Sequence, residues 1–352
     1  MCRLATILFA AALLGCAAIR PGTPQPTPVS ARESLPALPA ADRIRLAEAF
    51  RLAAAVGDQV WAGWSMAPFA VLLVTPEREF LLRHPHPSND FTSAGYDSLL
   101  ATEVFVRRRV FPPTFLATFP AVGGVPTIVV GQPTNTGQSS TRWVLTVLHE
   151  HFHQLQYSQP GYYQGVSDLG LSRGDTTGIW MLNYAFPYES AAVQERFAAF
   201  AGSLDTALTS RPAVRPERDT IRRGLLARAV ADARGRLRAA LSAEDDRYLA
   251  FQMWQEGVAR YTELQLARLA AESTNAPGGA FRTLPDYSDY AAAAAAIEHD
   301  IHVGLRDIKL GQTQRVAFYA AGAATALVLD TAAPDWHARY FGQNFVLERL
   351  LP

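Results

Sequence analysis

The chain has 352 residues, of which 49% are apolar and 18% charged, enough to build one large core or two modest ones and too much apolar material for a disordered protein. Lysine and arginine together number 32 and are balanced by 32 acidic residues, so no net field attracts a nucleic-acid backbone. We therefore expect no nucleic-acid partner, and we expect partners to bind through local surfaces.

The amino terminus predicts a secreted lipoprotein. Arg3 precedes an apolar run over residues 4–14, which is too short to span a bilayer as a mature helix and is typical of a secretion signal. The run ends in L-L-G-C, the pattern of a bacterial lipobox, so residues 1–15 would be removed and Cys16 would carry the lipid. A plain signal peptide with an incidental cysteine is the alternative. Ala17 is not the aspartate that retains such proteins on the inner membrane, which favours a cell-envelope location on the outer membrane.

Residues 16–40 are rich in proline, which favours an extended tether, and residues 41–352 form the expected folded domain. Apolar residues at helical spacing predict a first helix over residues 42–60, with Asp42 as its cap. Short apolar or alternating runs then predict a small sheet within residues 66–138, with strands at 69–74, 79–83, 104–110, 114–119 and 125–130.

From residue 139 onward, helix-favouring residues dominate and proline is confined to a few breaks. Residues 139–352 are therefore expected to be mainly helical. A sheet subdomain followed by a helical subdomain is an α+β fold, with the chemically active motif where the two meet.

The strongest chemical signal is H-E-x-x-H on a predicted helix over residues 139–159. His149 and His153 are four residues apart, so their rings lie one turn apart on one face and can bind the same zinc ion at about 2.0 to 2.1 Å. Glu150 projects beside that pair, where it can take a proton from zinc-activated water as general base. The alternative is a buried helix whose histidines are hydrogen-bonded in the core; His151, two residues from either ligand, is interpreted as structural in both cases.

Zinc in a hydrolase usually has three protein ligands and one water, so a third ligand is needed from another element. Glu256 lies on a predicted helix in which Gly257 and Ala259 remove bulk, which would let that helix approach the histidine helix closely. Glu189, also flanked by small residues on a predicted helix, is the alternative third ligand.

The segment around Glu256 resembles the second motif of gluzincin metallopeptidases of the aminopeptidase N kind, W-L-N-E-G-F-A-x-Y-x-E, whose first glutamate binds zinc. The match holds position by position at Glu256, Gly257, Ala259, Tyr261 and Glu263, whereas the tryptophan stands one place too close to the glutamate. The resemblance implies a zincin-like fold, a Zn²⁺ cofactor and peptide hydrolysis.

In that family a tyrosine from a Y-x-x-G-A segment stabilises the oxyanion of the tetrahedral intermediate. Tyr319 stands at the matching place in Y-A-A-G-A, so the resemblance implies that it donates this hydrogen bond. Ala321 replaces the family's lysine in this segment, and an ordinary helix tyrosine is the alternative interpretation.

Two departures from the family limit what can be transferred. The gap from His153 to Glu256 is much longer than in the family and is expected to hold an insertion of two or three helices. Residues 123–128 stand where the family has an acid that binds a free amino terminus, yet they contain none, which argues against an aminopeptidase. Residues 125–130 are predicted either as an edge strand that pairs with an extended peptide or as an interior strand.

These features predict a lipid-anchored zinc metallopeptidase that cuts internal bonds of a peptide or protein substrate. The alternative is a lipoprotein that keeps the fold without turnover and serves as a binding or scaffold module. The sequence does not identify the substrate, because the residues that line the pocket come from segments it cannot place.

Overall fold

The structure is a computed structural model, and it describes residues 36–210 and 216–352. Residues 36–352 form one unit. Cys16, the predicted signal peptide and most of the predicted tether lie outside the described residues. Within the described part of the chain, no helix has both the length and the apolar character needed to cross a bilayer.

The first half of the domain contains the expected sheet. Its six strands lie in the order β3-β4-β2-β1-β6-β5; only β1 and β6 run parallel, and the other neighbours are antiparallel. The strands are β1 (Val71–Val74), β2 (Arg78–Leu82), β3 (Thr92–Asp97), β4 (Thr102–Arg108), β5 (Leu116–Val122) and β6 (Val125–Gly131).

Two of these strands differ from the prediction. β3 is missing from the predicted set, because its residues T-S-A-G-Y-D are polar or small and almost entirely exposed, so no apolar alternation marks them. β6 lies between β1 and β5, so its interpretation as an edge strand is wrong and that as an interior strand is confirmed. The strand at this edge of the sheet is β5 instead.

Both faces of the sheet are covered by apolar residues. In β1, Val71 and Leu73 belong to the large core that the sheet shares with the helices, whereas Leu72 and Val74 belong to a smaller cluster on the opposite face. A two-residue turn at Gly123 and Gly124 joins β5 to β6, and both glycines have positive φ, 55° and 77°, as a tight hairpin turn requires.

The rest of the chain is mainly helical, as predicted. The helices of eight or more residues are α1 (Ala40–Val60), α3 (Ser140–Tyr157), α6 (Ala191–Thr209), α7 (Pro216–Arg238), α8 (Ala243–Gln252), α9 (Val258–Ala270), α11 (Tyr290–Arg306) and α13 (Ala317–Ala332). The shorter ones are α2 (Pro133–Thr136), α4 (Tyr162–Asp168), α5 (Trp180–Asn183), α10 (Gly279–Arg282), α12 (Leu310–Thr313) and α14 (Trp336–Tyr340). Single turns are η1 (Trp64–Met66), η2 (Met253–Gly257), η3 (Ser273–Asn275), η4 (Gln314–Val316) and η5 (Leu347–Leu350).

The start of α1 differs from the prediction. The helix begins at Ala40 after Pro39, so Asp42 lies in its first turn and does not cap it. The buried carboxylate of Asp42 instead accepts hydrogen bonds from Arg45 (2.8 Å) and from Gln132 (2.6 Å). It thereby joins α1 to the chain that follows β6.

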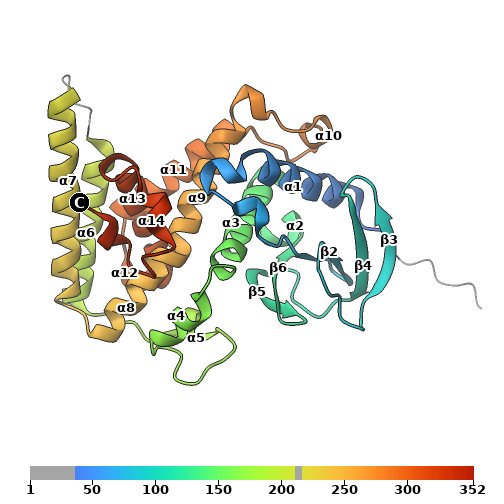
Figure 1. Cartoon of the computed structure of the whole chain (residues 1–352), viewed down its shortest axis with the longest axis horizontal. Coiled ribbons are helices and arrows are strands. Elements are labelled where there is room, and N and C mark those ends of the chain that lie inside the picture. Colours follow the sequence, from blue (N-terminus) through green and yellow to red (C-terminus); the bar gives the residue numbers. More distant parts are fainter. Residues whose placement is uncertain (1–35, 211–215) are drawn as a thin grey trace, which may run out of the picture. The chain divides into compact units, whose positions relative to one another are not determined.

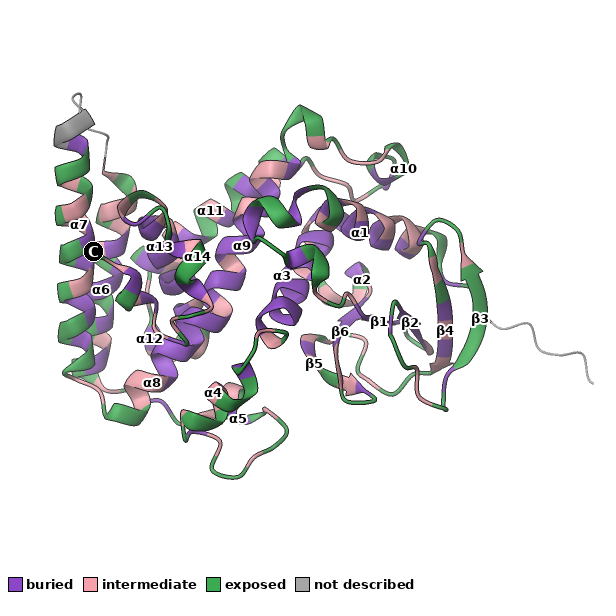
Figure 2. Cartoon of the chain, in the orientation of Figure 1, coloured by how far each residue is buried: buried purple, intermediate pink, exposed green. Residues whose placement is uncertain are grey.

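The predicted histidine helix is α3, and it lies between the sheet and the helical half of the domain (Figure 1). It contacts β5 and β6 on one side and α1 and α9 on others. Of its 18 residues, all but three are buried, and Figure 2 shows this burial along α3 and much of α9. The motif therefore lies on an interior helix, where solvent reaches few of its polar groups.

The insertion between the two motifs is larger than predicted. Among the described residues, α4, α5, α6, α7 and α8 lie between α3 and Glu256, instead of two or three helices. The long helices α6 and α7 pack side by side, and both also pack on α13. The insertion thus has its own packing partners and leaves α3 and α9 in contact.

Candidate metal centre

The histidine pair is oriented by a well-capped helix. Ser139 precedes α3, and its side chain accepts a hydrogen bond from the Arg142 backbone, so it caps the helix. His149 and His153 are both buried, 8% and 4% exposed, one turn apart. Their Nε2 atoms lie 3.7 and 3.4 Å from the same oxygen, Oε2 of Glu256.

Glu256 stands on the π-helical turn η2, between α8 and α9. Such turns are rare and occur often at functional sites, because the extra residue shifts the direction of a side chain. Gly257 is needed here, since a Cβ atom on it would lie 2.4 Å from Cα of Gly322 in α13. Gly257 therefore permits the approach of α13, which the sequence does not predict, while α9 does contact the histidine helix α3 as expected.

His149, His153 and Glu256 together form a group that could hold a metal ion. One ligand atom from each residue can be chosen so that all three lie within 4.8 Å of one another. Glu189, the alternative third ligand, is not in this group. It lies in a turn before α6, not on a helix; it is exposed, and its carboxylate lies beside Gly311.

The outward nitrogens of both histidines also have partners. Nδ1 of His153 lies 2.7 Å from Oε1 of Gln156, and the amide nitrogen of Gln156 donates to the Gln255 carbonyl (3.1 Å). Nδ1 of His149 lies 3.6 Å from Oε2 of the buried Glu263. An acceptor near each Nδ1 can hold a proton on that nitrogen, so Nε2, which faces Glu256, is the nitrogen that would bind a metal after losing its own proton.

The surroundings of this group favour positive charge. Burial lowers the pKa of His149, but hydrogen bonding to Glu256 and Glu263 outweighs burial and raises that pKa to about 9. Burial raises the pKa of Glu263, yet the charges of Arg260 and Arg142 together with His149 lower it to about 2. Burial likewise opposes ionisation of Glu256, and the charge of His153 outweighs it, so the pKa of Glu256 lies well below its usual value. Both carboxylates are therefore ionised at neutral pH.

Glu150, the predicted general base, lies on the same helix and is 7% exposed. The Thr118 hydroxyl, from β5, lies 2.8 Å from Oε2 of Glu150 and 2.9 Å from its carbonyl oxygen. The edge strand therefore fixes the Glu150 carboxylate from one side. No feature of the sequence indicates this contact, because Thr118 and Glu150 are far apart along the chain.

Tyr319, the predicted oxyanion donor, lies on α13 beside His149, with ring centroids 6.5 Å apart. It stands three residues before Gly322, so the close contact of Gly257 with Gly322 also brings Tyr319 toward Glu256. Its hydroxyl oxygen accepts a hydrogen bond from Arg315 (2.8 Å). Burial and the charge of Glu256 raise the pKa of Tyr319 well above its ordinary value, so the phenol keeps its proton.

His151 points away from this group, as predicted. Its ring stacks on Phe69 with centroids 3.7 Å apart, and its Nδ1 lies 2.9 Å from Oε1 of Gln154. Burial lowers the pKa of His151 to about 3, so this histidine is neutral at physiological pH. It packs α3 against the segment before β1.

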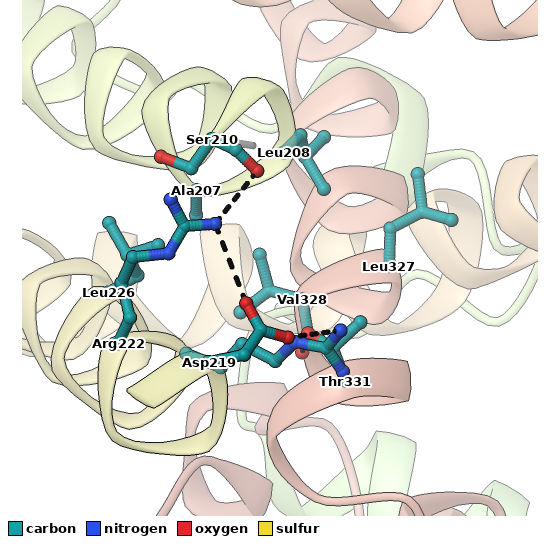
Figure 3. A pocket seen from close by; sticks show the side chains of 10 residues that line it. Ala207, Leu208, Ser210, Asp219, Arg222, Leu226, Leu327, Val328 and Thr331 are labelled. Carbon is teal, nitrogen blue, oxygen red and sulfur yellow. Dashed lines mark hydrogen bonds and ion pairs between the residues drawn. The ribbon is translucent and has the colours of Figure 1, made fainter. Parts of the chain in front are cut away.

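A cavity of about 270 Å³ lies away from these residues, between α6, α7 and α13 (Figure 3). Arg222 and Arg223 on its wall both pair with Asp219, at 3.7 and 2.6 Å, and Arg222 also donates to the Ser210 carbonyl. The two guanidinium groups thus share one carboxylate and fasten the start of α7 to the end of α6.

Comparisons with family models, with curated proteins and with solved structures find no match for this chain. The chemistry of the site is therefore inferred from the geometry of its residues. Sequence reasoning assigns no role to Thr118, Gln156, Glu263 or Arg315, which all contact the predicted residues. Gln156 and Arg315 stand three and four residues from His153 and Tyr319, so helical spacing could have suggested them.

Proposed function

We propose that this chain is a zinc-dependent metallopeptidase with a zincin-like fold, in which His149, His153 and Glu256 hold the metal. The observation that carries the proposal is the spacing of the three ligand atoms. Ligands about 2.0 to 2.1 Å from a tetrahedral ion lie about 3.3 Å from each other. The Nε2 atoms of the two histidines lie 3.7 and 3.4 Å from the Glu256 oxygen, so small side-chain movements suffice to complete such a site.

The donor set also favours zinc over harder cations. Two neutral imidazoles and one carboxylate suit zinc, whereas calcium and magnesium prefer sites built from oxygen atoms. When bound, zinc would polarise the scissile carbonyl and make water acidic enough to lose a proton near neutral pH.

Glu150 would take the proton from the attacking water and later deliver it to the leaving amine. Thr118 holds one carboxylate oxygen of Glu150, which restricts the orientation of the base. Tyr319 would donate to the oxyanion, and the contact with Arg315 supports this role. Because the Tyr319 oxygen accepts from Arg315, its own proton remains available for another acceptor.

Internal peptide bonds fit the site better than chain ends. β5 is the last strand of the sheet, so one of its edges has no strand partner among the described residues, and Thr118 on β5 contacts Glu150. An extended peptide could pair with that edge and pass Glu150. The β5–β6 hairpin, residues 116–131, contains no acid to bind a free amino terminus.

The decisive experiment compares the full chain with Glu150→Gln in a peptide-library assay, with zinc content measured by elemental analysis. Wild type should hold one zinc per chain and cut internal bonds. Removing a general base lowers rates by about 10² to 10⁴-fold, so Glu150→Gln should keep its zinc and lose nearly all cleavage.

The possible outcomes separate the alternatives. Full activity of Glu150→Gln would overturn the mechanism. Zinc binding by the wild type without cleavage of any peptide would favour a scaffold or binding protein. A wild-type chain that binds no zinc would show that the histidines serve only the core.

A further inference from the structure

A mostly apolar pocket of about 460 Å³ lies beside the candidate metal centre, within the size range of ligand-binding pockets. None of the described residues that line it carries a charge. Its walls come from the β5–β6 hairpin, the end of α3, the start of α4 and the segment before β1. Its lining includes Pro68, Pro120, Pro126, Gln154, Tyr157 and Tyr163.

Tyr157 joins this pocket to the catalytic residues. It stands one turn after His153 on α3, and the two rings have centroids 6.2 Å apart. Its hydroxyl donates to the Thr118 carbonyl (3.2 Å), and the Thr118 side chain contacts Glu150. The wall of the pocket and the support of the proposed base are therefore adjacent parts of one structure.

The edge strand sets the distance from the base to the pocket. Thr118 contacts Glu150, and Pro120, two residues later on β5, lines the pocket. Two residues of extended chain cover about 6 to 7 Å, which is also the spacing of side chains on one face of a bound peptide. A peptide that pairs with β5 can thus place one side chain in the pocket while a nearby peptide bond lies at Glu150.

The residues that line the pocket determine which side chain of a bound peptide it can accept. Rings of proline and tyrosine offer carbon surfaces, and the amide of Gln154 already donates to the Ala70 and Pro126 carbonyls, both at 2.9 Å. A charged side chain would lose its water there without a counter-ion, which is costly. Aromatic and branched aliphatic side chains meet no such cost and gain from the removal of apolar surface from water.

We propose that this pocket is a specificity subsite that receives an aromatic or branched apolar side chain of the substrate, close to the bond that is cut. The proposal rests on the proposed peptidase function, but the affinity of the subsite can be measured without turnover. Tyr163 forms its outer wall and is 54% exposed, so it can be shortened with little effect on the core.

The test uses the full chain with Glu150→Gln, loaded with zinc, and fluorescein-labelled alanine hexapeptides that carry Phe, Leu, Gly or Asp at each position in turn. Fluorescence anisotropy gives the affinity. At one position, the Phe and Leu peptides should bind at least about tenfold more tightly than the Gly peptide. Even one methylene group in an apolar pocket changes discrimination between ligands by about tenfold. Asp should bind no better than Gly.

The variants assign this preference to the pocket. Tyr163→Ala should reduce the Phe preference severalfold and leave the Gly peptide unchanged, while Tyr163→Phe should retain the preference. The matched control is Tyr96→Ala on β3, which removes another exposed tyrosine ring (67%) at the opposite edge of the sheet and should change nothing. Equal binding of Phe and Gly peptides, no binding of any peptide, or an unchanged preference in Tyr163→Ala overturns the subsite.

The same peptides distinguish this proposal from the proposed function. If Glu150→Gln shows the Phe preference but the wild type cuts no peptide, the subsite stands and the peptidase assignment fails. If the wild type cuts peptides with no apolar preference beside the cut, the assignment stands and the subsite fails.

Discussion

Two clusters of this molecule combine histidine with a carboxylate but differ in what their polar atoms do. The metal group consists of His149, His153 and Glu256. The second, here called the Asp330 cluster, joins α9, α13 and α14 through Tyr261, Asp330, Trp336 and His337. Among the described residues, only the metal group brings three ligand atoms within reach of one ion.

The Asp330 cluster is closed by its own hydrogen bonds. Asp330 accepts from Tyr261 (2.8 Å) and from Trp336 (2.8 Å), and Nε2 of His337 lies 3.0 Å from the Tyr261 hydroxyl. The ring of His337 stacks on Trp61, with centroids 4.5 Å apart. In the metal group, by contrast, the Nε2 atoms of the two histidines lie 3.7 and 3.4 Å from one carboxylate oxygen. Three side chains that each turn one possible metal ligand toward a common point are typical of a cation site, whereas a carboxylate whose oxygens are already occupied by fixed donors is typical of a structural network.

The largest expected effect is loss of metal in Glu256→Gln. An uncharged amide is a poor zinc ligand, so metal affinity should fall by more than the roughly 10- to 100-fold seen when a residue behind a ligand is removed. Zinc titration of the full chain measures this effect. A chelator should lower the melting temperature of the wild type, because bound metal stabilises the folded state, and should leave that of Glu256→Gln unchanged.

Asp330→Asn is the matched control for this change. It should bind zinc like the wild type and melt at a lower temperature, because one amide nitrogen would face the donors that Asp330 now satisfies, at a cost of about 1 to 3 kcal/mol. Equal zinc affinity of Glu256→Gln and Asp330→Asn would show that Glu256 is not a ligand.

The next largest difference in activity is expected between variants of Tyr319, beside the metal group, and Tyr261, in the Asp330 cluster. Tyr319→Phe should keep zinc and lower kcat by about 10² to 10³-fold, the usual result of removing an oxyanion donor, with little change in KM. Tyr261→Phe removes the same hydroxyl from the Asp330 cluster, so it should leave kcat unchanged and destabilise the fold by about 1 kcal/mol. Steady-state kinetics and thermal unfolding of both variants test this. If the two variants lose similar activity, Tyr319 has no special role.

The sequence was sufficient to predict the α+β fold, five of the six strands and the histidine helix, because each follows a local pattern of apolar residues. It also favoured Glu256 over Glu189, and Glu256 is the one that lies with the two histidines. The reason for this preference, small neighbours that let the helix approach α3, holds only in part, because Gly257 accommodates α13. Which helix a glycine faces depends on tertiary packing, and a local pattern carries no information about it.

The supports of the site were harder to predict, for the same reason. The sequence leaves residues 125–130 open as an edge strand or an interior strand and does not show that β5 occupies the edge, because residues 116–122 and 125–131 read equally well as strands and their order in a sheet is set by pairing. This ambiguity mattered for function. It hid Thr118, which reaches Glu150 only because β5 lies beside α3.

The smallest expected effect tests that hidden contact. Thr118→Val keeps the shape of the side chain and removes the hydroxyl that holds Glu150, so the base would lose its fixed orientation. The expected fall in kcat is about tenfold or more, since a hydrogen bond to a charged group contributes about 1.5 to 3 kcal/mol. Zinc affinity should not change, because Thr118 does not contact the ligands. Thr118→Ser restores the hydroxyl and should recover most of the activity. If Thr118→Val loses zinc, or if Thr118→Ser is as slow as Thr118→Val, then Thr118 supports the packing of β5 on α3 and not the orientation of the base.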